Sequence, residues 1–263
     1  MRRTRVYHGK SNHSRPFALF SHRGLLFLCN MNKLTEKAIA FAETTFFRTA
    51  TVLAVRAWEP NSILEIDLHM PECDMSRWTS AQHIKCKVGV LSYRDYTPSG
   101  WDAETHTCTL LIHVAHDGPG SRWARSLRPG GQLSYRKPES SHHHPVTSRM
   151  CFLGDETTIG HFLALQQLAK PGAVIGGAIL LTEPHHQTEF HDYFHGWDLA
   201  ALRKNEDSDY RELVNWVDAL DVREHGDTVF YLAGYIPGVV ELRRQMRRRG
   251  FAGSQVKAQG FWD

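Results

Sequence analysis

The chain has 263 residues, of which 41% are hydrophobic and 22% are charged, and its formal net charge is +3. This composition is typical of a globular protein, and the length accommodates one large domain or two small ones. No apolar run is long enough to cross a bilayer, so we expect no stable membrane insertion. The net charge is too weak to indicate nucleic-acid binding.

The positive charge is concentrated at the start of the chain. Residues 1–30 contain six Arg and Lys residues and no acid, so residues 31–263 carry a net charge of −3. A basic segment without acids is typical of organellar transit peptides. The alternative is that translation begins at Met31, because a plausible domain starts just after it. On either interpretation we expect residues 1–30 to be a basic tail, disordered or not translated, and outside the fold.

The cysteines indicate the compartment. They are odd in number and form no CxxC pair, which suits a reducing cytosol better than a disulfide framework, so we expect a cytoplasmic protein. They are Cys29, Cys73, Cys86, Cys108 and Cys151.

The pattern over residues 51–145 predicts short antiparallel strands. Residues 63–70 alternate between apolar and polar side chains, and residues 51–58 form a partner strand across the Pro60-Asn61 turn. Further strands fit residues 83–88 and 107–114. Several short strands at this spacing predict a small antiparallel barrel.

The period changes after about residue 146. Nearly continuous apolar runs at 150–153, 173–182 and 228–233 are typical of strands covered on both faces. Helical stripes follow or separate them. The stripes are Ile159, Phe162, Leu163 and Leu168; Leu213, Val214, Val217 and Leu220; and a last helix from Pro237 to Gly250. Alternating strands and helices predict a three-layer α/β half with a parallel sheet.

A first motif, Arg94-Asp-Tyr-Thr-Pro98, ends a predicted strand. A flavin dinucleotide needs a cation for its pyrophosphate and a flat, hydrogen-bonding surface for its ring. Arg94 can supply the cation, Tyr96 the surface and Thr97 a hydroxyl near the ring. The alternative is an ordinary strand-end turn with an exposed arginine.

A second motif runs from His113 to Trp123, about twenty residues later. Its Gly118-Pro119-Gly120 turn lets the backbone approach a phosphate, and Ser121 stands where a helix N-terminus would bind an anion. The alternative is a plain Gly-Pro turn.

Together these motifs resemble the siderophore-interacting protein family, a branch of the ferredoxin-reductase superfamily. The His83-Ile-Lys85 strand and the Arg136–Ser141 loop also resemble family segments. The matching residues of the two motifs are Arg94, Tyr96, Thr97, Pro98, Gly118, Pro119, Gly120, Ser121 and Trp123.

The C-terminal half continues the resemblance. Phe152–Thr157 resembles the family's apolar strand followed by Gly-Asp-Glu-Thr, and Tyr231–Gly234 resembles its last strand near the nicotinamide. Lys257–Trp262 resembles its Gly-aromatic-Trp tail. The resemblance spans about residues 45–262, with the motifs in the expected order.

The resemblance implies two domains. The first is an FAD-binding antiparallel Greek-key β-barrel over residues 31–145. The second is a three-layer α/β domain with a parallel sheet over residues 146–263, which binds NAD(P)H. The implied FAD-binding residues are Arg94, Tyr96, Thr97, Pro98, His113, His116, Gly118, Pro119, Gly120, Ser121, Trp123, Ser140 and Ser141. The implied NAD(P)H-binding residues are Gly154, Asp155, Glu156, Thr157 and Gly234.

Two departures from the family pattern affect these assignments. Family members often have His-Gly before the Gly-Pro turn, whereas this chain has His113-Val114 or His116-Asp117, so either histidine can be the one that meets the flavin. The family also has Gly-Glu after its last strand, and this chain has Gly234-Tyr235.

The implied activity is transfer of electrons from NADH or NADPH through FAD to ferric siderophores, releasing Fe(II) for iron acquisition. A ferredoxin is an alternative electron donor, and we expect a monomer. Because ferric siderophores are often anionic, Lys85, Arg243 and Lys257 are candidates to bind them. The alternative is that such cations are merely solvated or favoured at a helix C-terminus. No residue is assigned as catalytic.

Seventeen histidines invite a metal-site interpretation. Those at 142–144 and between 185 and 195 lie in Pro- and Gly-flanked polar segments without HExxH or Cys partners, so we expect solvated loop histidines and no metal site. Glu183 and the histidines after it leave NADH and NADPH equally open.

Three other functions stay open. A general flavin or quinone reductase of the same superfamily would share the FAD motifs. A non-enzymatic siderophore-binding protein would purify colourless. Nucleic-acid binding through the tail would disappear when residues 1–30 are deleted.

Overall fold

The computed structural model describes residues 46–263 apart from 195–196 and 206–209. Phe46–Asp263 form one compact unit. The predicted basic tail therefore lies outside the described residues, and so does the Asp207-Ser208 pair that precedes the predicted stripe at 213–220.

The first half of the described chain forms an antiparallel sheet in the strand order β4-β3-β7-β1-β2-β6-β5, with β8 paired to β3. The strands are β1 (Phe47–Trp58), β2 (Ile63–His69), β3 (Gln82–Gly89), β4 (Ser92–Tyr96), β5 (Ser99–Asp102), β6 (Thr107–His113), β7 (Gln132–Arg136) and β8 (Glu139–Ser140). The sheet is barrel-like and not closed, because the pairings of the described strands run from β4 to β5 without joining these two edges.

The alternation of apolar and polar side chains predicted over residues 63–70 determines which face of this sheet is buried. Ile66 and Leu68 of β2 are fully buried, while Glu65 and Asp67 face outward and pair with Arg56 of β1. Because side chains alternate along a strand, this register buries one face of the sheet. The short helix α2 (Pro119–Ser126) contributes Ala124 to the same core.

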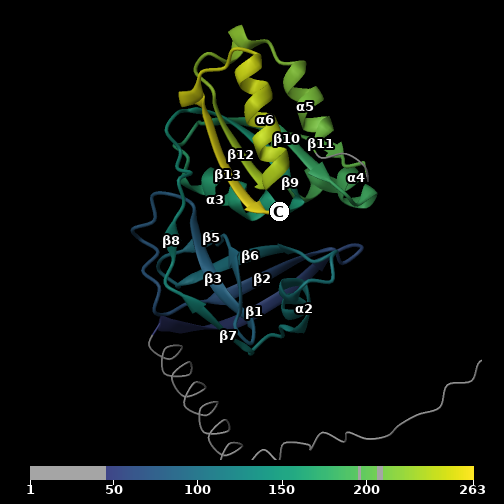
Figure 1. Ribbon diagram of the computed structural model, residues 1–263. Coiled ribbons are helices and arrows are strands. Elements are labelled where there is room, and N and C mark those ends of the chain that lie inside the picture. The colour runs from purple at the N-terminus through teal and green to yellow at the C-terminus, as the bar shows by residue number, and fades with distance from the viewer. Residues whose placement is uncertain (1–45, 195–196, 206–209) are drawn as a thin grey trace, which may run out of the picture. The chain divides into compact units, whose positions relative to one another are not determined.

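The second half forms a parallel sheet in the order β11-β10-β9-β12-β13, drawn in green and yellow in Figure 1. Its strands are β9 (Arg149–Asp155), β10 (Val174–Leu181), β11 (Asp198–Arg203), β12 (Val229–Tyr235) and β13 (Val256–Trp262). From β9 the chain first adds β10 and β11 on one side, and then adds β12 and β13 on the other side of β9. This reversal makes a topological switch point at the carboxyl ends of β9 and β12, where such sheets bind their ligands.

Helices cover both faces of the parallel sheet, as the continuous apolar strands predict. Phe152 packs with one pair of helices, whereas the next residue, Leu153, packs with the other pair. The first pair is α3 (Ile159–Leu168) and α4 (Pro184–Tyr193), and the second pair is α5 (Arg211–Asp218) and α6 (Ile236–Arg248). The α3/α4 core also contains Trp58 and Ile63 of the antiparallel sheet, so this layer is buried between the two sheets.

The fold class predicted from the sequence is confirmed, with the difference that the barrel stays open. The domain boundary at residue 145 stays a prediction; the change from antiparallel to parallel pairing falls between Ser140 and Arg149. No helix of the described chain is both long and apolar enough to cross a membrane. The described cysteines are free and buried.

The histidine prediction was wrong in two places. His185 to Tyr193 form helix α4 rather than a loop, because Pro184 occupies the first turn, where proline favours helix initiation. His186 is 2% exposed and lies edge-on to Trp58. His143 of the histidine triplet is also buried, at 1% exposure.

Candidate functional site

A cavity of about 290 Å³ opens where the antiparallel sheet meets the carboxyl edge of the parallel sheet. Five predicted site residues line it: Arg94, Tyr96, Thr97, Ser141 and Thr157. The other lining residues are His83, Tyr93, Asp95, Leu111, Gly160, His161, Gln259, Gly260 and Phe261. The chain therefore brings segments that are up to about 180 residues apart to one cavity.

The two predicted flavin motifs lie against each other. The rings of Tyr96 and Trp123 stack with centroids 5.6 Å apart and planes 13° apart. A Cβ placed on Gly120 would lie 2.6 Å from the Tyr96 hydroxyl and 3.3 Å from Cγ of Arg94. Only glycine at position 120 therefore allows helix α2 to approach the cavity wall this closely.

The N-terminus of α2 is suited to an anion. Pro119 occupies its first turn, and its N-cap residue Gly118 provides no side-chain cap. The amides of Gly120 and Ser121 thus lack a capping acceptor, and the helix dipole adds partial positive charge beside the exposed Arg94.

The serines after β7 have different environments. Ser140 pairs with Gln82 across β8 and β3, and its hydroxyl meets the Gln82 side chain at 3.2 Å. Ser141 lines the cavity, and its hydroxyl accepts a hydrogen bond from the His143 amide at 3.0 Å. The loop that follows the antiparallel sheet is therefore anchored at the cavity.

At the switch point, Asp155 organises the backbone. Its carboxylate accepts from the Thr157 amide at 2.9 Å and from the Tyr210 hydroxyl at 2.7 Å. The Tyr210 hydroxyl in turn accepts from the Tyr235 amide at 3.0 Å. Gly234 has φ +109°, and a Cβ there would lie 2.2 Å from that hydroxyl. Asp155 and Gly234 thus shape the turn that was predicted to meet NAD(P)H, and Thr157 extends from it into the cavity.

Glu156 and His113 form a buried pair with their nearest atoms 3.5 Å apart. Burial raises the pKa of Glu156 and lowers the pKa of His113 to about 3. The Thr182 hydroxyl donates to Glu156 at 2.6 Å, and the second carboxylate oxygen has no partner in the described chain. His113 therefore faces the parallel-sheet turn and does not line the cavity. The exposed His116 lies edge-on to the ring of His113.

The C-terminal strand closes one side of the cavity. The Phe261 ring lies 5.2 Å from the ring of His161, and the Trp262 indole donates to the Thr157 hydroxyl at 3.2 Å. Lys204 stands 5.6 Å above the Trp262 ring. The tail that was identified only by resemblance thus contacts Thr157 of the predicted NAD(P)H site and lines the same cavity as the flavin-motif residues.

The three predicted siderophore-binding cations do not line the cavity. Lys85 is engaged with both carboxylate oxygens of Asp95 at 2.8 Å. Arg243 is exposed on α6, and Lys257 lies on β13. Among the described residues, no group of three or more His, Cys, Asp or Glu side chains is arranged to hold a metal ion.

Sequence reasoning missed His161. It lies in the first turn of α3, four residues beyond the cavity-lining Thr157, and is 2% exposed. Its Nδ1 is 3.4 Å from the Thr97 hydroxyl and its Nε2 is 2.9 Å from Nδ1 of His143. The available signal was a polar residue inside an otherwise apolar helical stripe that begins directly after the Gly-Asp-Glu-Thr turn.

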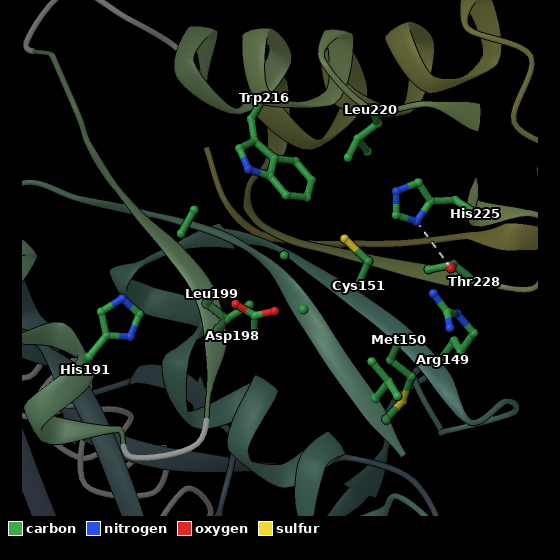
Figure 2. A pocket seen from close by; sticks show the side chains of 14 residues that line it. Arg149, Met150, Cys151, His191, Asp198, Leu199, Trp216, Leu220, His225 and Thr228 are labelled. Atoms are coloured by element: carbon green, nitrogen blue, oxygen red, sulfur yellow. Dashed lines mark hydrogen bonds between the residues drawn. The ribbon is translucent and has the colours of Figure 1, made fainter. Parts of the chain in front are cut away.

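A second cavity, of about 460 Å³, lies at the opposite, amino edge of the parallel sheet. Figure 2 shows Trp216 of α5, and Leu220 just after the end of that helix, extending toward it, with Arg149 and Asp198 at the beginnings of their strands. Its lining includes none of the predicted site residues. It also lies at the wrong end of the strands for a nucleotide.

The residues around the smaller cavity fit FAD. The α2 N-terminus and Arg94 provide the positive charge that a pyrophosphate needs. Two buried polar atoms of the lining residues, Nδ1 of His83 and Oε1 of Gln259, have no hydrogen-bond partner within the described chain. Because unpaired buried polar atoms are unfavourable, they favour a polar ligand beside them.

Comparison with known proteins supports an FAD-binding domain and this fold. Residues 87–142 match the family model described as the siderophore-interacting FAD-binding domain. No curated protein matches the chain. The chain is similar in structure to the siderophore-interacting protein of Acinetobacter baumannii, at 15% identity and TM-score 0.69, over 82% of this chain and 90% of that one.

Two further structures illustrate the range of the fold. The siderophore-interacting protein SipS of Aeromonas hydrophila matches at 21% identity and TM-score 0.68, over 82% of this chain and 91% of that one. A ferredoxin reductase in carbazole 1,9a-dioxygenase matches at 18% identity and TM-score 0.67, over 82% and 69%. These structural matches establish the fold, and the family model over residues 87–142 confirms the resemblance to siderophore-interacting proteins. Together they support a flavin-reductase-type role.

Proposed function

We propose that this protein is an FAD-dependent reductase that passes electrons from NAD(P)H to ferric siderophores and releases Fe(II). The observation that carries this proposal is the single cavity lined by both flavin-motif residues and the switch-point turn. A shared cavity supports this proposal, because hydride transfer requires the nicotinamide and the flavin ring to lie next to each other.

Each segment has its own task in this proposal. Arg94 and the α2 N-terminus hold the pyrophosphate, and Tyr96, stacked on Trp123, supports the ring system. Thr97 presents a hydroxyl to the ring, and Ser141 fixes the loop on the opposite wall. Thr157 and Gly234 receive the nicotinamide nucleotide at the carboxyl edge.

FAD, when bound here, supplies the conversion of a two-electron hydride donor into a source of single electrons. The chain's own contribution is position and exclusion of water. Phe261 and Leu111 provide an apolar wall, and burial raises the pKa of the Tyr96 hydroxyl above its usual value.

A second candidate is a general flavin or quinone reductase. The observation that favours it is the charge of the described cavity lining, which holds the cation Arg94 beside the anion Asp95. These two charges cancel, so the lining offers no surplus of positive charge for an anionic chelate. A neutral acceptor fits such a lining equally well.

The test is a spectrum followed by an acceptor panel. The purified full chain is expected to carry a flavin spectrum that NADH or NADPH bleaches anaerobically. A ferric siderophore is then expected to restore it while Fe(II) is trapped by a chromogenic chelator. Faster recovery with a neutral quinone than with any ferric siderophore would select the second candidate. A colourless protein that cannot be loaded with FAD would overturn both.

A further inference from the structure

Two buried histidines lie behind a side chain of the cofactor cavity. His161, in the first turn of α3, is 2% exposed, and His143, in the loop after β8, is 1% exposed. Their facing nitrogens, Nε2 of His161 and Nδ1 of His143, lie 2.9 Å apart. The other nitrogen of His161, Nδ1, lies 3.4 Å from the hydroxyl of Thr97, which lines the cavity. The proposed function assigns no task to either histidine.

At neutral pH both rings are uncharged, so each carries one proton on one of its two nitrogens. Burial lowers the pKa of His143 to about 4 and the pKa of His161 well below its usual value. The neighbouring groups that contribute to these shifts are all bases. They are His83, His142, His144 and Lys257. The direction of the hydrogen bonds therefore depends on which nitrogen of each neutral ring carries the proton.

The contact between the two rings allows two arrangements, because one proton must lie between the facing nitrogens. In the first, His143 donates from Nδ1 to Nε2 of His161, and Nε2 of His143 is a bare acceptor. In the second, His161 donates from Nε2, and Nε2 of His143 carries an N–H group. That nitrogen is buried and has no partner in the described chain. Because an unpaired buried N–H group is rarer than an unpaired acceptor, the first arrangement is favoured.

The first arrangement determines how the Thr97 hydroxyl is oriented. The proton of His161 then lies on Nδ1, so an N–H group faces the Thr97 oxygen. The 3.4 Å distance is long for a hydrogen bond, as is common where a ligand has still to close the site. An N–H group attracts the oxygen and repels the hydroxyl hydrogen. The hydrogen of Thr97 therefore points away from α3 and toward the cavity.

We propose that His143 and His161 position the Thr97 hydroxyl so that it donates a hydrogen bond into the cofactor cavity. This inference rests on the proposed function, because the acceptor that it assigns belongs to the ring system of oxidised FAD. The polar edge of that ring presents several acceptor atoms and a single N–H donor, so a hydroxyl fixed as a donor complements it. Thr97 contacts the ring, and the two histidines act through Thr97 as positioning residues.

The surrounding packing holds the three side chains in place. A Cβ on Gly160 would lie 3.4 Å from the Thr97 carbonyl oxygen, so the backbone of α3 lies directly against the Thr97 segment. Edge-on contacts with Phe261 and Tyr231 hold the two histidine rings. A donor that is oriented before its ligand arrives loses little conformational freedom on binding, and this increases affinity.

The first test observes the histidine protons. The full chain labelled with ¹⁵N-histidine is examined by NMR before and after FAD is added, and the signals are assigned from those lost in His161→Asn and His143→Phe. Both His161 and His143 are expected to carry the proton on Nδ1 in both states. A proton on Nε2 of His161 in either state would overturn the proposal, since a bare Nδ1 draws the Thr97 hydrogen away from the cavity.

The hydroxyl itself is tested by the affinity for FAD. Thr97→Val keeps the shape of the side chain without the hydroxyl, and we expect the FAD dissociation constant to rise by about 10-fold, the effect of one hydrogen bond. Thr97→Ser keeps the hydroxyl and should bind FAD within about twofold of the wild type. Fluorescence titration of the apoproteins measures both. Equal affinities of Thr97→Val and the wild type would contradict the proposal.

A matched pair of variants at His161 tests the positioning role. Asn reaches the position of Nδ1 and can donate to Thr97 from there, whereas Leu has the same shape and cannot. We expect the FAD dissociation constant to rise by about threefold in His161→Leu and by less than about twofold in His161→Asn. In the Thr97→Val background, His161→Leu should have no further effect, because no hydroxyl is left to position. Effects that multiply in the double variant would mean that His161 acts on FAD by itself, and the proposal would be wrong.

The outcomes separate this inference from the proposed function. Wild-type protein that cannot bind FAD overturns both. Wild-type protein that binds FAD and reduces ferric siderophores, with His161 protonated on Nε2, overturns the positioning role alone. If His161→Leu does not fold, the wild-type spectrum and the Thr97 variants still decide the question.

Discussion

The two edges of the parallel sheet carry cavities of different character. At the carboxyl edge the cavity is the smaller, yet glycines and unpaired polar atoms surround it. At the amino edge the cavity is larger. Gly177 in its lining is required by strand pairing and not by a ligand, since a Cβ there would lie 2.0 Å from the Phe152 carbonyl oxygen. Volume alone would choose the wrong edge, whereas strand polarity and close backbone approach indicate the site.

The largest expected effect that tests this comparison is at Gly234. Gly234→Ala places a Cβ against the Tyr210 hydroxyl at positive φ, and we expect it to lower the free energy of unfolding by about 3 kcal/mol or more. Urea unfolding measures this. Gly226→Ala is the matched control, because φ at Gly226 is −60° and a Cβ there meets nothing within 4 Å. Equal losses in both variants would contradict a special role for the carboxyl-edge turn.

The next effect is on cofactor affinity. Arg94→Ala removes the cation beside the α2 N-terminus, and we expect the FAD dissociation constant to rise by about 10- to 100-fold. Fluorescence titration of the apoprotein measures it. Arg149→Ala removes the corresponding cation from the amino-edge cavity, where it pairs with Asp227 at 3.2 Å, and should leave FAD affinity unchanged. A rise in both variants would mean that the two edges are not distinct.

Stability should also depend on pH through the carboxyl-edge histidines. Burial lowers the pKa of His113 to about 3 and that of His143 to about 4, from 6.5. Between those values and 6.5 the unfolded chain binds more protons than the native one. Stability is therefore full above about pH 6.5 and falls with pH toward about 4, by up to about 1.4 kcal/mol per pH unit for each histidine.

Urea unfolding at about pH 7 and about pH 5.5 measures this dependence. His143→Phe removes one titrating group, so its stability should fall less between these two pH values than that of the wild type. A variant with the same pH dependence as the wild type would show that His143 does not contribute.

The smallest expected effect is at the amino-edge cavity. His191→Ala removes a lining residue from α4 and is expected to change the free energy of unfolding by no more than about 0.5 kcal/mol. FAD affinity and NAD(P)H oxidation should stay within about twofold of wild type. A large loss of either would assign this cavity a role in the reaction and break the contrast between the edges.

The sequence was most informative where local pattern and tertiary packing agree. The alternation at 63–70 and the apolar runs at 150–153 and 228–233 became β2, β9 and β12, because burial on one face or two leaves a clear period. Helix α4 was missed because its exposed face is polar and histidine-rich, and β11 was missed because it is short and only partly buried.

The site could be predicted as separate segments of the sequence, but not as a three-dimensional arrangement of side chains. Arg94, Tyr96 and Thr97 were predicted because they lie within one short motif, and Thr157 because it ends a recognisable turn; all four line the cavity. His161 contacts the site through tertiary packing with Thr97 and His143, which no spacing in the sequence encodes. Lys85 was assigned to substrate from its motif position alone, and its pairing with Asp95 depends on the β3–β4 register.

The close approach of α3 to the antiparallel sheet affects how the protein unfolds. A Cβ on Gly160 would lie 3.4 Å from the Thr97 carbonyl oxygen, so the helix backbone itself forms the junction. A ligand in the cavity then binds only when both halves are folded, and its binding free energy stabilises them jointly. At a ligand concentration of 100 times its dissociation constant this amounts to about 2.7 kcal/mol. We therefore expect a bound cofactor to raise the unfolding midpoints of the two halves together.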